Sequence, residues 1–205
     1  AKILLPTWYL NIAIFDQKIE GFQSNTFIGT GFVLANAGSQ SSDGFEFDLV
    51  VSPTESIDLA ISGLFMDPIY DSFPNSSAGD LTGTIPSNIS EDTISSTVTW
   101  NWSSNNWDGY FRLSHLYASE AKMLENPAWQ SILEAAGNGI KTQDTLNFSA
   151  GLEKENLSIM FWGKNINDDK YLISAFPAVA DPTSSSFFGY PNAYRSYGLT
   201  INYMF

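Results

Sequence analysis

Strict alternation of bulky apolar and small or polar residues is the feature that most constrains this sequence. In DGFEFDLVVS (residues 43–52), apolar side chains occupy every second position and alternate with glycine, acidic residues and serine. The same period of two recurs in seven further segments: residues 8–17, 56–65, 93–102, 107–117, 145–152, 156–165 and 197–205. A period of two is the mark of a β-strand with one apolar face. The sequence therefore predicts an all-β, antiparallel meander of about eight strands.

The connections between these segments alternate between short and long. Residues 53–56, 103–106 and 153–156 are tight polar turns, whereas residues 74–90, 119–142 and 174–193 are long irregular stretches. Successive connections of an antiparallel meander lie at opposite ends of the sheet, so all short turns are expected at one end and all long loops at the other. We expect one short helix in the second long stretch, because Ile132, Leu133 and Ala136 have helical spacing.

Two architectures fit this pattern, a soluble β-sandwich and a transmembrane β-barrel. Only 15% of residues are charged, against about 25% in typical globular proteins, and few lysines occupy the polar positions. Asymmetry of the connections is typical of outer-membrane barrels, which favours the barrel. Five aromatic residues near strand ends suit an interfacial girdle: Trp8, Trp100, Trp102, Trp107 and Tyr203. A carbohydrate-binding sandwich and a small stand-alone structural barrel remain as alternatives, since eight strands suffice to close a barrel.

Charge and residue usage exclude several classes of function. The net charge of −13 argues against nucleic acid as a partner, because phosphate binding needs a basic surface. There is no cysteine, and the single histidine, His115, lies on a predicted strand without a nucleophile motif, so we interpret it as structural. NINDDK (residues 165–170) lacks the full calcium-loop pattern. We therefore predict no enzyme activity, no catalytic residue, no metal and no cofactor.

Three stretches together carry a resemblance to a known family. They are NIAIFDQKIEGFQ from Asn11, NAGSQSSDGFEFDL from Asn36, and WGKNINDDKY from Trp162; the chain then ends in YRSYGLTINYMF. In this order they resemble the late strands of TonB-dependent outer-membrane receptors. The matching positions are Asn11, Ala13, Phe15, Asn36, Ala37, Gly38, Gly44, Glu46, Pro53, Gly163, Asn165, Asp168 and Tyr171.

The resemblance implies a barrel of 22 strands with an internal plug and a segment that engages TonB. This chain has about eight predicted strands and neither of those parts. Residues 1–205 are thus expected to be the C-terminal part of the barrel, with Ala1 at a cut and Phe205 at a true C-terminus. The implied function is TonB-dependent uptake of a scarce nutrient across the Gram-negative outer membrane. A ferric siderophore is the commonest expectation, with oligosaccharides or cobalamin as alternatives. The implied partners are outer-membrane lipid, the TonB complex through the missing plug region, and the barrel-assembly machinery.

Three groups of candidate site residues follow from this interpretation. Aromatic residues on long extracellular loops are the candidates for ligand contact: Tyr70, Phe73, Trp129, Phe187, Phe188 and Tyr190. Polar residues expected to face the lumen are Glu46, Asp48 and Arg112, and we expect Arg112 and Arg195 to pair with acids such as Glu46 or Asp48. The resemblance also implies a C-terminal assembly signal made of alternate apolar residues: Leu199, Ile201, Tyr203 and Phe205.

Overall fold

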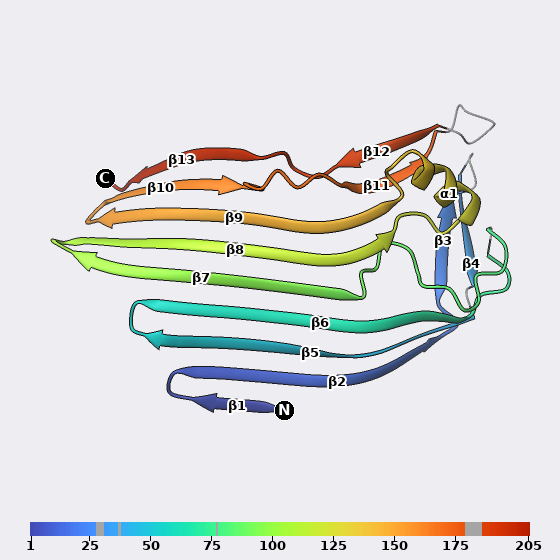
Figure 1. Cartoon of the computed structure of the whole chain (residues 1–205), viewed down its shortest axis with the longest axis horizontal. Coiled ribbons are helices and arrows are strands. Elements are labelled where there is room, and N and C mark those ends of the chain that lie inside the picture. The colour runs from blue at the N-terminus through green and yellow to red at the C-terminus, as the bar shows by residue number, and fades with distance from the viewer. Residues whose placement is uncertain (28–30, 37, 77, 179–185) are drawn as a thin grey trace.

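Nine antiparallel strands form a single open sheet (Figure 1). The computed structural model describes residues 1–27, 31–36, 38–76, 78–178 and 186–205. Within them the strand order is β1-β2-β5-β6-β7-β8-β9-β10-β13, and β1 and β13 do not pair with each other. The strands are β1 (Lys2–Leu5), β2 (Trp8–Glu20), β5 (Ser39–Thr54), β6 (Ile57–Ser72), β7 (Asp92–Ser104), β8 (Trp107–Lys122), β9 (Ile140–Lys154), β10 (Leu157–Lys164) and β13 (Ser196–Tyr203).

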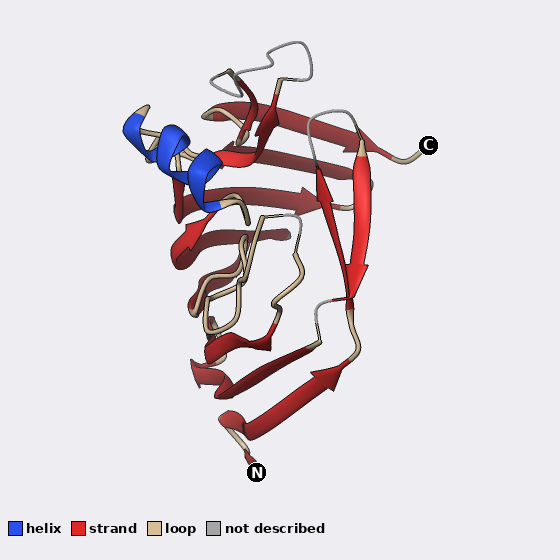
Figure 2. Ribbon diagram, turned by 90° about the vertical axis from the view of Figure 1, so that its right-hand side faces the viewer, coloured by secondary structure: helices blue, strands red, loops and turns tan. Residues whose placement is uncertain are grey.

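In the described part of the chain, two hairpins and one helix lie at the end of the sheet that carries the long connections. They are β3 (Gln23–Phe27) with β4 (Phe32–Asn36), β11 (Leu172–Pro177) with β12 (Phe187–Pro191), and α1 (Pro127–Ala135). Figure 1 shows α1 and the β3–β4 hairpin at the same end of the sheet. Figure 2, turned by 90°, shows that they lie on opposite sides of the molecule at that end. Within the described residues, no helix has the length and apolar character needed to span a bilayer.

Strand register gathers the alternating residues into two faces that run across the whole sheet. Phe47 lies opposite Ile12, and Leu49 lies opposite both Leu10 and Ile61. The same apolar face continues through β7, β8, β9, β10 and β13, as in the opposed residues Val98 and Leu113. The residues between them form the opposite, polar face, which consists mostly of small and polar side chains together with a few large ones such as Tyr110 and Trp162. A one-residue slip would exchange the two faces, so the alternation fixes the register.

The short turns all lie at one end of the sheet and the long connections at the other, as predicted (Figure 1). Asn105 and Asn106, at the β7–β8 turn, have φ angles of 50° and 64°, and Asn tolerates this left-handed region better than most residues. All five aromatic residues predicted for a girdle lie at the short-turn end: Trp8, Trp100, Trp102, Trp107 and Tyr203.

The structure corrects the sequence-based description in three places. The sheet has nine strands, because the short apolar segment at residues 2–5 forms β1. The stretch 174–193, expected to be irregular, contains most of the β11–β12 hairpin, although residues 179–185 lie outside the described residues. A two-sheet sandwich is wrong, since one continuous sheet carries both faces. The predicted short helix is confirmed as α1.

Candidate functional site

The long connections pack into an ordered surface at one end of the sheet. Tyr70 and Phe73 are 3% and 0% exposed and form a cluster with Leu81, against which Phe22 packs. The Phe22 and Tyr70 rings stack with centroids 5.6 Å apart. Tyr70 and Phe73 were expected among exposed loop aromatics. They are instead buried, because Leu81 of the β6–β7 connection and Phe22 pack against the end of β6 and the residue that follows it.

Glu125 joins two of the long connections. Its Oε1 atom accepts a hydrogen bond from the Tyr70 hydroxyl at 2.8 Å. The same oxygen accepts bonds from the Ser87 amide at 3.0 Å and the Ser87 hydroxyl at 3.1 Å. Asn88 adds a bond from its side-chain amide to the carbonyl of Met123 at 3.0 Å. The connections β6–β7 and β8–β9 therefore form one hydrogen-bonded unit.

Two polar side chains of its own connection, Asn126 and Gln130, hold the helix α1. Asn126 is its N-cap and accepts bonds from the amides of Ala128 and Trp129, and proline follows at the first helical position. Gln130, 5% exposed, accepts from the amides of Met123 and Leu124 and donates to the Gly139 carbonyl. These bonds hold the helix against the ends of β8 and β9. Trp129 lies half-buried on this helix.

The β11–β12 hairpin has one buried and one exposed face. Ala175, Leu172 and Phe187 pack on the side that meets Met123 and Leu133, the latter from α1. On the opposite side the Phe176 ring lies 5.6 Å from Phe188 and 5.8 Å from Tyr190, measured between centroids. We call Phe176, Phe188 and Tyr190 the aromatic face. Because Phe188 and Tyr190 are 56% and 58% exposed, this face is the best-formed candidate contact surface at this end of the molecule.

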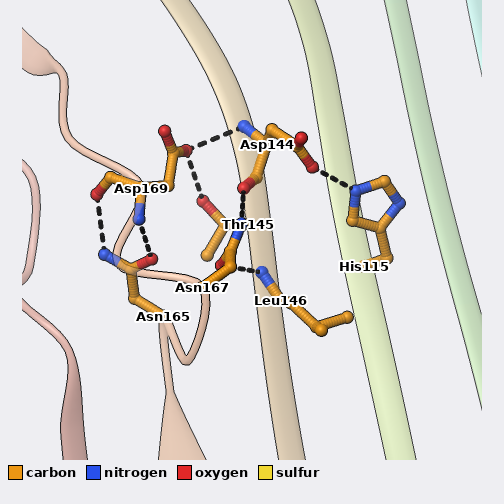
Figure 3. Close-up of polar contacts among 7 residues, drawn as sticks. All are labelled: His115, Asp144, Thr145, Leu146, Asn165, Asn167 and Asp169. Carbon is orange, nitrogen blue, oxygen red and sulfur yellow. Dashed lines mark hydrogen bonds and ion pairs between the residues drawn. The ribbon is translucent and has the colours of Figure 1, made fainter.

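The base of this hairpin is tied together by two buried asparagines, Asn165 and Asn192, which are 3% and 8% exposed. The Asn165 side-chain amide donates to the carbonyls of Asp169 at 2.8 Å and Ala193 at 2.9 Å. Its Oδ1 accepts from the Asp169 amide at 2.8 Å (Figure 3). Asn192 donates to the same Asp169 carbonyl at 2.8 Å and accepts from the Tyr171 amide at 3.2 Å.

A second set of contacts ties the same segment to β9 (Figure 3). The Asp169 carboxylate accepts from the Asp144 amide at 2.8 Å and the Thr145 hydroxyl at 3.2 Å. Asn167 accepts from the Leu146 amide at 3.0 Å and donates to the Asp144 carbonyl. Burial raises the pKa of the nearby Tyr171 hydroxyl, and the charge of Asp169 raises it further. The Asp169 carboxylate thus acts in hydrogen bonding within the fold.

Sequence reasoning gave Asn165 only as a motif position and did not find Asn192. The motif spacing Gly163, Asn165, Asp168 and Tyr171 marked Asn165 in the sequence. Its hydrogen bond to the carbonyl of Ala193 could not be predicted, because Ala193 lies 28 residues further along the chain. Among the described residues, no group of three or more histidines and acidic residues is placed to hold a metal ion.

The three polar candidates lie on the polar face of the sheet, where Glu46 is opposite Ala13 and Asp48 is opposite Asn11. The predicted pairing of Arg112 with these acids is wrong. Its Nε donates to the Thr99 hydroxyl at 3.2 Å, and β6 and β7 separate it from β5. Three strand spacings separate the backbones by roughly 14 Å, and among the described residues no ion pair joins Arg112 to either acid.

His115 lies on the apolar face, opposite Ser96 and Leu146. Its Nε2 lies 2.5 Å from Asp144 Oδ1, and both side chains are accessible (Figure 3). The backbone amide and carbonyl of Asp144 take part in the contacts with Asp169 and Asn167 described above. The interpretation of His115 as a residue of a strand face agrees with its place in β8.

The four residues expected to form an assembly signal lie on or just after β13. Leu199 and Ile201 lie opposite Phe161 and Ile159, and Tyr203 lies opposite Leu157, so all three belong to the apolar face. Phe205 follows the strand, with its ring centroid 5.2 Å from that of Tyr203. Thr200 lies on the polar face, where it accepts from Trp162 Nε1 at 3.3 Å.

Comparison with known proteins gives a direct family assignment. A family model described as TonB dependent receptor-like, beta-barrel, matches residues 2–166. This match covers most of the chain, so the chain belongs to the TonB-dependent receptor β-barrel family. Comparison with curated protein sequences finds no match.

Solved receptor structures share the fold at low sequence identity. The ferric yersiniabactin uptake receptor FyuA from Yersinia pestis superposes with a TM-score of 0.75 at 16% identity, over 98% of this chain and 28% of that one. The ferric-catecholate import receptor Fiu from E. coli K12, in its closed form, has a TM-score of 0.70 at 15% identity, over 100% of this chain and 26% of that one. The siderophore receptor PiuA from Acinetobacter baumannii has a TM-score of 0.67 at 16% identity, over 98% of this chain and 26% of that one. This chain therefore spans between a quarter and a third of the length of these receptors.

Proposed function

We propose that this chain is the C-terminal part of the barrel of an outer-membrane receptor that takes up a ferric siderophore in a TonB-dependent manner. The observation that carries the proposal is the family match over residues 2–166. The open sheet and the small share of each related receptor that it covers support a sector of a larger barrel. The plug and the segment that engages TonB would then belong to other parts of the receptor.

The choice of a ferric siderophore is supported by several structural neighbours. FyuA is a ferric yersiniabactin uptake receptor, Fiu is a ferric-catecholate import receptor and PiuA is a siderophore receptor. Their identity to this chain is low, so the cargo is inferred at the level of a chemical class. In this proposal the apolar face contacts outer-membrane lipid, the short turns lie in the periplasm, and the aromatic face contacts the ligand outside the cell.

Growth of a deletion strain tests the cargo. The gene is deleted, and growth is measured with individual ferric siderophores as the sole iron source and, separately, under cobalamin or oligosaccharide limitation. We expect loss of growth on one ferric siderophore, with recovery when the intact gene is returned. Normal growth on every ferric siderophore, together with a defect on cobalamin or an oligosaccharide, would contradict the iron assignment.

Substitution of the aromatic face tests its role in ligand contact. The Phe188→Ala, Tyr190→Ala double variant is expected to reduce binding of the identified ligand without reducing the amount of receptor at the cell surface. Tyr194→Ala is the matched control, because Tyr194 is 67% exposed but lies outside the aromatic face. Equal binding by both variants would remove the aromatic face from the site.

A further inference from the structure

We infer that Asn165 and Asn192 position the β11–β12 hairpin as a rigid arm that holds the aromatic face in place before ligand arrives. The inference deepens the proposed function and rests on it for the identity of the ligand. Asn165 contacts no residue of the aromatic face in the hydrogen bonds described above. It is therefore a positioning residue and acts through the hairpin.

The first step is the closure of the hairpin base. Asn165 donates to one carbonyl before β11 and one carbonyl after β12, so a single side chain joins both ends of the hairpin. Asn192 repeats this connection, because its amide donates to Asp169 while its Oδ1 accepts from Tyr171. A neutral amide can donate twice and accept at once, which a carboxylate cannot do. Both side chains are buried, so a lost partner is not replaced by water at low cost.

The second step is the attachment of this base to the sheet. β10, which pairs with β9, ends at Lys164. Beyond that point, side chains rather than a strand backbone bond to β9. Asp169 accepts from the amide of Asp144, and Asn167 accepts from the amide of Leu146. The backbone amide of Ile166 also donates to the Leu146 carbonyl at 2.8 Å. The hairpin base is thus bonded to a strand at the interior of the sheet.

The third step is the packing of the hairpin body. Ala175 and Phe187 pack against the cluster that includes Leu133 of α1. The helix is in turn fixed by Gln130 to the ends of β8 and β9. Attachment at the base and along one face leaves the aromatic face as the free side. A contact surface that is ordered in advance binds with a smaller entropic cost than one that orders on binding.

Asn165→Asp in the full receptor tests the inference with a nearly isosteric change. Asn165 has a φ of 50°, a conformation that Asp also tolerates, so the backbone preference is kept while both donated bonds are lost. Asn138→Asp is the matched control, since Asn138 is exposed and its side chain donates only to the nearby Ala136 carbonyl. Heat-modifiable migration of each variant confirms that the barrel has folded.

The first measurement is a spin-label distance between Cys introduced at Thr142 on β9 and at Ser174 on β11. Residues 1–205 contain no cysteine, so within this region labels attach only at the introduced positions. We expect a narrow distance distribution in the parent and in Asn138→Asp. In Asn165→Asp we expect a distribution at least about twice as wide, because a local segment freed from its contacts samples more conformations. An equally narrow distribution in Asn165→Asp would overturn the inference.

The second measurement is affinity for a ferric-catecholate complex, arranged as a double-mutant cycle. Asn165→Asp is expected to weaken binding roughly tenfold in the parent receptor, through loss of two hydrogen bonds that hold the arm. In the Phe188→Ala, Tyr190→Ala background it should have no further effect, because the arm then has no aromatic face to present. Additive losses would show that Asn165 does not act through the aromatic face. Absence of binding by the parent would overturn this ligand class, and the distance distribution would still decide the positioning role.

Discussion

At the scale of single residues, close approach of aromatic rings to glycines shapes the polar face. A Cβ atom on Gly198 would overlap the Trp162 ring, and one on Gly151 would overlap the Tyr110 ring. Trp162 also donates to Thr200 at 3.3 Å, so its ring is held over Gly198 by packing and by a hydrogen bond. Glycine is required at these positions for space.

Gly198→Ala is therefore expected to destabilise the folded receptor by about 1–3 kcal/mol, the usual cost of forcing extra volume into a packed site. The added methyl group must displace Trp162, so the tryptophan emission should also shift. Thermal unfolding in detergent and fluorescence provide the measurements. Gly31→Ala is the control, because a Cβ there would meet no atom within 4 Å. Equal stability of the two variants would contradict this account.

Residue roles were predictable where they depend on strand parity. Glu46, Asp48 and Leu199 lie on the expected faces because alternation alone decides the face. The burial of Tyr70 depends on Leu81 and Phe22, which approach from other connections and carry no local signal. The contact of Arg112 with Thr99 depends on which strands are neighbours and at which register, so charge complementarity alone gave the wrong partner.

At the scale of elements, long strands and tight turns were predictable, whereas short strands were not. Lys2–Leu5 is too short and too uniformly apolar to display a period, and it is defined by its pairing with β2. β11 and β12 have five or six residues each, and the side chains that connect their base come from outside the hairpin. α1 was predictable from its spacing, and its N-cap and proline are local signals.

Strand β8 allows a direct test of the two faces. Leu113→Arg is expected to reduce insertion of the receptor, since a cation on the lipid-facing side of a barrel costs about 2–4 kcal/mol near the middle of the bilayer. Ser114→Arg is the control, because Ser114 lies next in sequence on the polar face, opposite Thr97 and Asn147. Outer-membrane fractionation measures the insertion. Similar losses for both variants would mean that the faces are assigned wrongly.

The residue pattern of strand β13 leads to a prediction about assembly of the receptor in the outer membrane. Phe205→Ser in the full receptor is expected to lower the amount assembled in the outer membrane more than it lowers folded-state stability. Phe205 packs against Tyr203 and is otherwise fully exposed, so little folded-state packing is lost. Quantitative surface labelling and thermal unfolding of the assembled fraction separate the two effects. Met204→Ser serves as the control, and normal surface levels of Phe205→Ser would refute the prediction.

At the scale of the whole molecule, the sheet exposes apolar residues along its full width. Ile14, Trp100 and Leu199 are 86%, 52% and 62% exposed, and they lie on different strands of one face. A continuous apolar surface of this kind is a site of association in water. Burial against lipid, as in the proposed barrel, removes this surface from water.

Residues 1–205 prepared without detergent are therefore expected to aggregate, whereas detergent should keep them dispersed. Size-exclusion chromatography with light scattering measures the difference, and circular dichroism reports whether β-structure is retained. A folded and monodisperse chain in plain buffer would contradict a lipid-facing role for the apolar face.

The side chains that complete β9 have a consequence for self-association. A strand whose backbone groups lack partners can recruit a strand from another copy, which leads to domain swapping or to fibrous aggregates. Beyond the end of β10, Asn167 and Asp169 occupy the backbone groups of residues 144–146 that a foreign strand would use. A strand from another copy would therefore find these backbone groups of β9 already bonded at the point where its regular strand partner, β10, ends.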